Sequence, residues 1–182
     1  MHHRYPVPAL VGLLAFVGLL SACGGGSSQP KWQKQPIDDL IKQYSQHQNY
    51  QIILYDMDYD EASDQYRHQY EVQYEPLENP DTLLSDIGEF TTVSDTYFNQ
   101  HVDDMGMALV SKTDGELEKA AAPPGYSRYV GNERYGQWRT DNSGNRFWEF
   151  YGKYAFMRSM FGFYSPVRYG YWNDYHLSLI HI

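Results

Sequence analysis

The strongest constraint on the fold comes from two runs of alternating side chains, residues 50–60 and 65–75, separated by Glu61-Ala62-Ser63-Asp64. In the first run, one alternating set is Ile53, Tyr55, Met57 and Tyr59, and the other is Ile52, Leu54, Asp56 and Asp58. A period of two residues is typical of a strand, because successive side chains point to opposite faces. Two such runs joined by four residues predict an antiparallel hairpin.

The second run has two faces of contrasting chemistry. One alternating set is Tyr66, His68, Tyr70, Val72 and Tyr74. The other set is polar throughout: Arg67, Gln69, Glu71, Gln73 and Glu75. An antiparallel strand of this kind covers a core with one face and meets water with the other. Because a lone hairpin is only marginally stable, we expect a third strand or a helix to cover its aromatic face.

Three segments have apolar residues at helical spacing. Residues 36–44 begin with Pro36 and two aspartates, which suit the first turn of a helix. Ser94 is a suitable N-cap for a helix running to Met105, with a predicted buried side of Tyr97, Phe98, His101, Val102 and Met105. The third segment has the stripe Phe147, Phe150, Tyr151, Tyr154, Met157 and Phe161.

Turn residues separate further elements. Thr113-Asp114-Gly115 lies between residues 107–112 and 116–121 and predicts a second hairpin, and residues 141–145 predict another turn. Strands and helices follow one another without a regular βαβ alternation, which indicates an α+β fold with antiparallel hairpins and a few short helices. We expect one small globular domain over residues 36–161, followed by a tyrosine- and glycine-rich mobile tail over residues 162–176.

The amino-terminal residues have the pattern of a secretory signal peptide. Arg4 precedes an apolar run over residues 7–20, and small residues follow. That run is shorter than the roughly 20 residues that span a bilayer. Leu20-Ser21-Ala22-Cys23 closely resembles the lipobox of bacterial lipoproteins. The resemblance implies cleavage after residue 22, diacylglycerol on the Cys23 thiol and a third acyl chain on the new amino terminus. The alternative is an ordinary secreted protein with an incidental cysteine.

Residues 23–35 follow as a lipidated cysteine and a flexible tether. The seven residues 24–30, which are rich in glycine and serine, would hold a domain on the order of 15 Å from the membrane. In the enterobacterial sorting pattern, aspartate after the lipidated cysteine favours retention in the inner membrane. Gly24 stands there instead. We therefore expect lipid anchoring at the periplasmic face of the outer membrane if the organism is Gram-negative.

The charge of the chain argues against nucleic acid as a partner. Signal-peptide removal takes away Arg4, one of 14 basic residues, so 13 basic and 23 acidic residues leave a formal charge of −10. Nucleic-acid-binding domains usually have a basic surface. Cys23 is the only cysteine, so lipidation leaves no thiol for a disulfide.

No motif for metal, cofactor or catalysis stands out. Residues 56–60 resemble the start of a calcium loop, but Glu61 replaces the turn glycine and Arg67 replaces the bidentate glutamate. The histidines His47, His68, His101 and His176 lack the spacing of a zinc site. The sequence around Ser127, Gly125-Tyr126-Ser127-Arg128-Tyr129, lacks the second glycine of the nucleophile-elbow motif. We predict no metal and no cofactor, and we favour a protein that is not an enzyme.

Aromatic side chains are concentrated in residues 126–172, which hold 16 of the chain's 30. They form either a core of large side chains or an exposed surface that stacks on peptidoglycan sugars or an envelope protein. For the second possibility, the candidate binding residues are Tyr129, Tyr135 and Trp138. For the first, we expect Trp148 to be buried.

The last six residues, 177–182, match the translation of a transposase end sequence used in sequencing adapters. We interpret them as adapter-derived, and the alternative is a short apolar strand. The complete pattern predicts a lipid-anchored cell-envelope protein that acts as a non-catalytic binding or structural module. The alternative function is an envelope hydrolase that acts on cell-wall or surface polymers through unidentified carboxylates.

Overall fold

The computed structural model describes residues 35–180, so the predicted signal peptide, Cys23 and the predicted tether up to residue 34 lie outside the described residues. The elements are α1 (Pro36–Gln43), β1 (Tyr50–Asp60), β2 (Gln65–Tyr74), β3 (Leu84–Ile87), β4 (Thr91–Val93), α2 (Asp95–Gln100), β5 (Ala108–Thr113), β6 (Glu116–Glu118), β7 (Gly136–Thr140), β8 (Arg146–Phe150), the 3₁₀ turn η1 (Gly152–Tyr154), α3 (Met157–Met160) and α4 (Tyr169–Ile180). Helices combined with antiparallel strands confirm the predicted α+β class.

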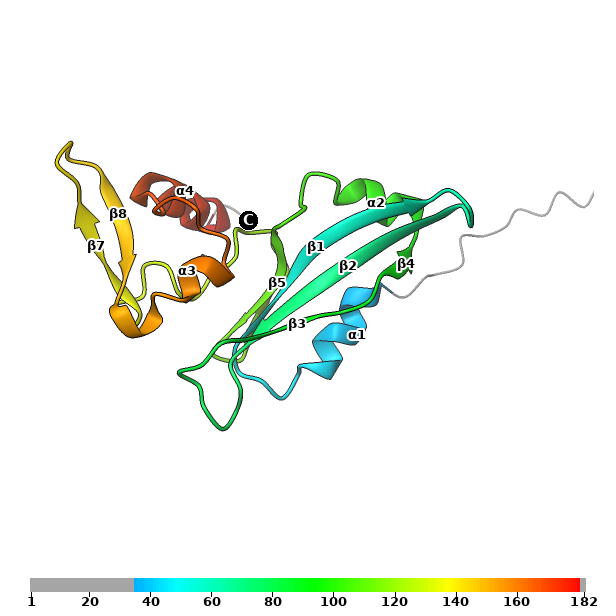
Figure 1. The fold of residues 1–182 in the computed structure, drawn as a ribbon, viewed down its shortest axis with the longest axis horizontal. Helices are drawn as coiled ribbons and strands as arrows, with labels where there is room; N and C mark the ends of the chain where they lie inside the picture. Colours follow the sequence, from blue (N-terminus) through cyan, green and yellow to red (C-terminus); the bar gives the residue numbers. More distant parts are fainter. Residues whose placement is uncertain (1–34, 181–182) are drawn as a thin grey trace, which may run out of the picture. The chain divides into compact units, whose positions relative to one another are not determined.

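The larger sheet has the strand order β3-β2-β1-β5-β6, and β4 also pairs with β2 (Figure 1). The predicted hairpin of β1 and β2 is confirmed, with Tyr50 opposite Tyr74 and Asp60 opposite Gln65. Strands β7 and β8 form a separate two-stranded sheet. All pairings between these strands are antiparallel.

A β-bulge at Tyr55 corrects the predicted faces of β1. The register shifts between Leu54 and Asp56, so Tyr55 has no partner on β2. Ile52 and Leu54 before the bulge lie opposite Val72 and Tyr70, in the core. Met57 after the bulge lies opposite His68 on the same face. The predicted grouping of Ile53 and Tyr55 with Met57 is wrong because the extra residue exchanges the two faces.

The polar face of β2 is only partly exposed to water. Tyr70 and Val72 are buried as predicted, but Gln73 and Glu75 are buried as well. Gln73 donates through Nε2 to the carbonyl oxygen of Met160 at 2.8 Å and accepts from Gln51 Nε2 at 2.7 Å. The prediction of a solvated face is therefore wrong at this end of the strand, because residues from the carboxyl-terminal half cover it.

The two amino-terminal helix predictions are confirmed in position. Pro36 lies in the first turn of α1, and Ile37 and Tyr44 join the core cluster against the sheet. Ser94 caps α2 by accepting from the backbone N–H of Tyr97 at 3.1 Å.

Helix α2 ends much earlier than expected. The helix stops at Gln100, and Val102 and Met105 beyond it are exposed. The predicted burial of these two side chains is wrong because residues 101–106 form turns, closed by Gly106 at φ +82°.

The two further turns are confirmed. Asp114 and Gly115 both have positive φ and join β5 to β6 as a two-residue hairpin loop. The side chain of Asp141 accepts backbone N–H groups of Ser143 and Asn145 in the loop between β7 and β8.

The predicted continuous helix from Phe147 is wrong. Residues Arg146–Phe150 form β8, and Trp148 lies opposite Trp138. Only η1 and the single turn α3 follow. Pairing with β7 provides the backbone hydrogen bonds that a helix would otherwise form within itself. These contacts outweigh the helical spacing of the apolar side chains in the sequence.

The predicted end of the globular domain at residue 161 is also wrong. Helix α4 occupies much of the expected mobile tail. Val167 is buried in a core cluster with Trp148, and Trp172 and Tyr175 pack against that cluster. The alternative of a short strand after residue 176 is wrong as well, because the helix continues to Ile180. The adapter origin of residues 177–182 stays an interpretation.

Candidate functional site

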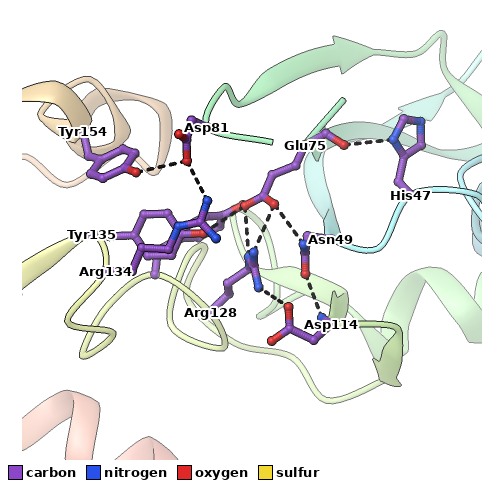
Figure 2. A network of polar contacts seen from close by, with 10 residues as sticks. His47, Asn49, Glu75, Asp81, Asp114, Arg128, Arg134, Tyr135 and Tyr154 are labelled. Atoms are coloured by element: carbon purple, nitrogen blue, oxygen red, sulfur yellow. Dashed lines mark hydrogen bonds and ion pairs between the residues drawn. The ribbon is translucent and has the colours of Figure 1, made fainter. Parts of the chain in front are cut away.

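The densest polar cluster of the described residues surrounds the carboxylate of Glu75, which directly follows β2 (Figure 2). Arg128 donates to it twice, from Nε to Oε1 and from Nη2 to Oε2, each at 3.0 Å. Asn49 donates to Oε2 at 2.9 Å. The hydroxyls of Tyr129 and Tyr135 donate to Oε1 at 3.0 and 3.3 Å. The carboxylate is only 4% exposed.

This cluster connects three parts of the chain. Arg128 also donates from Nη1 to Asp114 at 2.8 Å, in the turn between β5 and β6. The backbone N–H of Asp114 donates to Asn49 at 2.7 Å. The carbonyl oxygen of Glu75 accepts from His47 Nδ1 at 3.0 Å. We call Asn49, Glu75, Arg128, Tyr129 and Tyr135 the polar joint.

The ionisation of the polar joint follows from burial and pairing. Burial opposes the charge on Arg128, but the hydrogen bonds and charge of Glu75 outweigh it and raise the pKa of Arg128. Burial, followed by the charge of Glu75, raises the pKa of Tyr135 to about 12 and that of Tyr129 well above its ordinary value. Both tyrosines therefore remain neutral hydrogen-bond donors at neutral pH.

The polar joint is a structural element rather than a reactive centre. A carboxylate has about four lone-pair sites, and Glu75 accepts five hydrogen bonds from its neighbours. No acceptor capacity is left for a substrate proton or a metal ion. The bidentate geometry of Arg128 gives direction to the contact between the end of β2 and the residues after Gly125.

The structure brings two of the predicted binding residues together but buries them. Tyr129 and Tyr135 are 4% and 0% exposed, with ring centroids 5.0 Å apart. Their burial in a core cluster fits the first of the two possibilities, a core of large side chains, and not the alternative of an exposed stacking surface. Their hydroxyls serve Glu75, a partner more than 50 residues away that no local pattern reveals.

Trp138 lies apart from these tyrosines, in the aromatic cluster between β7, β8 and α4. Its ring is half-buried and lies 5.1 Å from Trp148, 5.4 Å from Trp172 and 5.0 Å from Tyr169. Trp148 is buried, which confirms its predicted place in a core. Three rings thus pack around Trp138 and leave its side chain only partly exposed.

His68 is the most enclosed of the histidines in the described residues. The ring is 0% exposed, Nδ1 lies 3.0 Å from the hydroxyl of Tyr70, and Nε2 is buried without a hydrogen-bond partner. Phe98 and His101 flank the ring. Among residues 35–180, no group of three potential ligands is placed to hold a metal ion.

A groove of about 520 Å³ runs between α1 and the strands β3 and β4. Leu40, Tyr70 and Val72 form part of its apolar wall, and the carboxylates of Asp39, Asp86 and Glu89 also line it. No lysine or arginine is among the described residues that line this recess. We call it the acidic groove.

The acidic groove was not predicted from the sequence, because its outer wall consists of short polar strands. Residues 84–87 and 91–93 are too short and too polar for a clear strand pattern, although they pair with β2. Tyr44 from the end of α1 donates its hydroxyl to Asp86 at 2.8 Å. Burial, and then this hydrogen bond, raise the pKa of Tyr44, so it stays a donor.

No family model matches this chain, and neither a curated protein nor a solved structure matches it. No helix between residues 35 and 180 is both long and apolar enough to cross a membrane. The function is therefore inferred from the residues and their geometry.

Proposed function

We propose that this chain is a lipid-anchored, non-catalytic binding module of a bacterial cell envelope. The observation that carries the proposal is the sequence Leu20-Ser21-Ala22-Cys23 at the end of an apolar run. Two or three acyl chains on Cys23 would make the attachment effectively permanent, whereas one chain binds only reversibly. The glycine after Cys23 favours the periplasmic face of the outer membrane.

Two features of the folded part support a binding role. The acidic groove is a recess of about 520 Å³ with an apolar wall and charged side chains, as binding sites commonly have. The most elaborate polar cluster, the polar joint, is fully engaged in holding the fold. An envelope protein or a peptidoglycan component is the expected partner class, and nucleic acid is not.

Labelling with palmitate in a bacterial host tests the anchor. The wild-type protein should incorporate the label and fractionate with membranes. Cys23→Ala should abolish incorporation, because no thiol remains for diacylglycerol. Ser27→Ala, in the tether, should be labelled like the wild type. Labelling of Cys23→Ala equal to that of the wild type would contradict the proposal.

The second candidate function is an envelope hydrolase. The observation that favours it is the grouping of Asp39, Asp86 and Glu89 around one groove, since glycosidases use two facing carboxyl groups. Incubation of the purified protein with peptidoglycan sacculi separates the two functions. Release of soluble fragments that is lost in Asp86→Asn would establish the hydrolase, and absence of release supports the binding module.

A further inference from the structure

We propose that the acidic groove and the adjoining edge of β3 bind an extended, lysine- or arginine-bearing segment of a partner protein, which adds to the sheet as a strand. The proposal rests on the binding role proposed above but not on the lipid anchor. It names the chemistry of the partner: free backbone amides and positive charge.

The edge of β3 is available for strand addition. β3 is the last strand of the larger sheet, and no strand of the described residues pairs with its outer side. The backbone N–H of Gly88 donates to the carbonyl oxygen of Tyr70 on β2 at 3.0 Å. Because backbone groups alternate along an antiparallel strand, those of Ser85 and Ile87 point away from β2. An exposed edge of this kind is a template for another chain.

The charge around this edge selects the occupant. Asp86 lies opposite Val72 in the β2–β3 register, and both line the acidic groove. Glu89 also lines the groove, and no basic side chain in the described part of the lining offsets these two carboxylates. An extended segment with lysine or arginine at alternate positions would direct each cationic head to these carboxylates.

Apolar surface beside the carboxylates fits the rest of such a segment. Leu84, Ile87 and Phe90 are 41%, 52% and 37% exposed at or next to the edge. Lysine and arginine bury their aliphatic stems on apolar surface while the charged head stays near water. In an added strand, alternate side chains would reach Ile87 on the face opposite Asp86. The occupant is therefore amphipathic as well as basic.

Fluorescence anisotropy with the full-length protein in detergent micelles, whether or not Cys23 is lipidated, tests this proposal. The probe is a labelled hexapeptide of alternating lysine and valine, and its glutamate–valine counterpart is the control peptide. We expect the lysine peptide to bind at least tenfold more tightly. The double variant Asp86→Asn, Glu89→Gln should weaken its binding at least tenfold. Asp103→Asn, Glu133→Gln removes the same charge from exposed sites elsewhere and should leave binding unchanged.

Two further arms test strand addition itself. Ile87→Pro removes an outward N–H that makes no bond to β2, so the peptide should lose at least tenfold in affinity while the protein still unfolds cooperatively. If that variant fails to fold, N-methylation of alternate peptide amides provides the same test on the wild-type protein. Equal binding of the methylated and unmethylated peptides would overturn strand addition.

Other occupants give different results, and each would overturn the proposal. If the peptide binds only after Lys31→Gln and Lys34→Gln, the occupant is the chain's own segment before α1. If the peptide does not bind and sedimentation shows a dimer that Ile87→Pro dissociates, the occupant is a second copy. Failure of peptide binding together with palmitate labelling of Cys23 would reject this inference and leave the anchor standing.

Discussion

Glu75 has its charge balanced by residues distant in sequence. Its carboxylate is buried with Arg128, and the two are separated by 53 positions. Removing one partner of a buried, hydrogen-bonded pair leaves the other charge without compensation, which costs more than the pair itself contributes. Stability at this position therefore depends on keeping both partners, whatever the net contribution of the ion pair.

Glu75→Ala should lower the free energy of unfolding by about 3–5 kcal/mol. The variant leaves the buried Arg128 guanidinium with only the exposed carboxylate of Asp114 as a partner. It also leaves the hydroxyls of Tyr129 and Tyr135 without their acceptor. Urea unfolding measures the loss. Glu133→Ala, at an exposed position, should change stability by less than about 0.5 kcal/mol. Similar values for the two variants would contradict the structural role of the polar joint.

His68 should make the stability of the fold depend on pH. Burial, followed by the charge of His101, lowers the pKa of His68 from 6.5 to about 4. Tyr70 and Tyr97 face the same ring, and His101 itself pairs with Asp104 at 2.7 Å. Between pH 6.5 and 4 the unfolded chain binds a proton at His68 that the folded chain excludes. Its contribution to stability is therefore complete above pH 6.5 and is lost as the pH falls towards 4.

The size of this effect is on the order of 3 kcal/mol, since one pKa unit corresponds to about 1.4 kcal/mol. Urea unfolding at a series of pH values measures it as the difference between wild type and His68→Gln. We expect the wild type to lose more stability on acidification than the variant. Parallel pH curves for the two proteins would show that His68 titrates in the folded state as it does in the unfolded state.

At the scale of elements, predictions succeeded where the contacts are local and failed where the partner lies far away in the sequence. The hairpin of β1 and β2 was predictable because its contacts are local and its side chains alternate. The bulge at Tyr55 was not, because an extra residue leaves no mark in a run where both faces contain apolar side chains. The burial of Gln73 was also hidden, since its partner at Met160 is 87 positions away.

Gly125 positions the loop that carries Arg128. Its φ is +82°, its N–H donates to Gln51 Oε1 at 2.9 Å, and an added Cβ would lie 2.6 Å from Cδ2 of Phe161. Gly125→Ala should therefore destabilise the fold by about 1–2 kcal/mol from backbone strain alone, with a further loss from the displaced Phe161 ring. Thermal or urea unfolding measures the change.

Gly144→Ala is the matched control for this prediction. Gly144 has φ +84°, but an added Cβ would have no atom within 4 Å. It should show only the backbone part of the cost, about 1–2 kcal/mol. If Gly144→Ala destabilises the protein as much as Gly125→Ala, the clash between the methyl group added at position 125 and the Phe161 ring does not contribute to the loss of stability.

At the scale of the whole molecule, the class of the fold follows from the sequence but the sites do not. Period-two runs, an Asp-Gly turn and a serine cap gave the α+β class, two hairpins and the position of α2. Tyr129 and Tyr135 are buried and do not form an exposed stacking surface. The sequence could not decide this, because a high density of aromatic residues occurs both in cores and on binding surfaces. The acidic groove could not be anticipated, because it forms only when β3 pairs with β2 opposite α1.

The proposed lipid anchor would determine where the folded domain acts. Residues 23–35 link the proposed attachment point to α1, which begins at Pro36 and lines the acidic groove. With the proposed anchor in place, a groove held on the order of 15 Å from a membrane would meet partners in the envelope at high local concentration. The proposed function therefore depends first on the chemistry of Cys23.

Mass spectrometry of the tryptic peptide spanning residues 23–31, from protein expressed in a bacterial host, tests that chemistry most directly. The account predicts a peptide that begins at Cys23 and has the added mass of diacylglycerol on the thiol, with or without a third acyl chain on its amino group. An unmodified Cys23, whether in a longer uncleaved peptide or in one cleaved elsewhere, would contradict it.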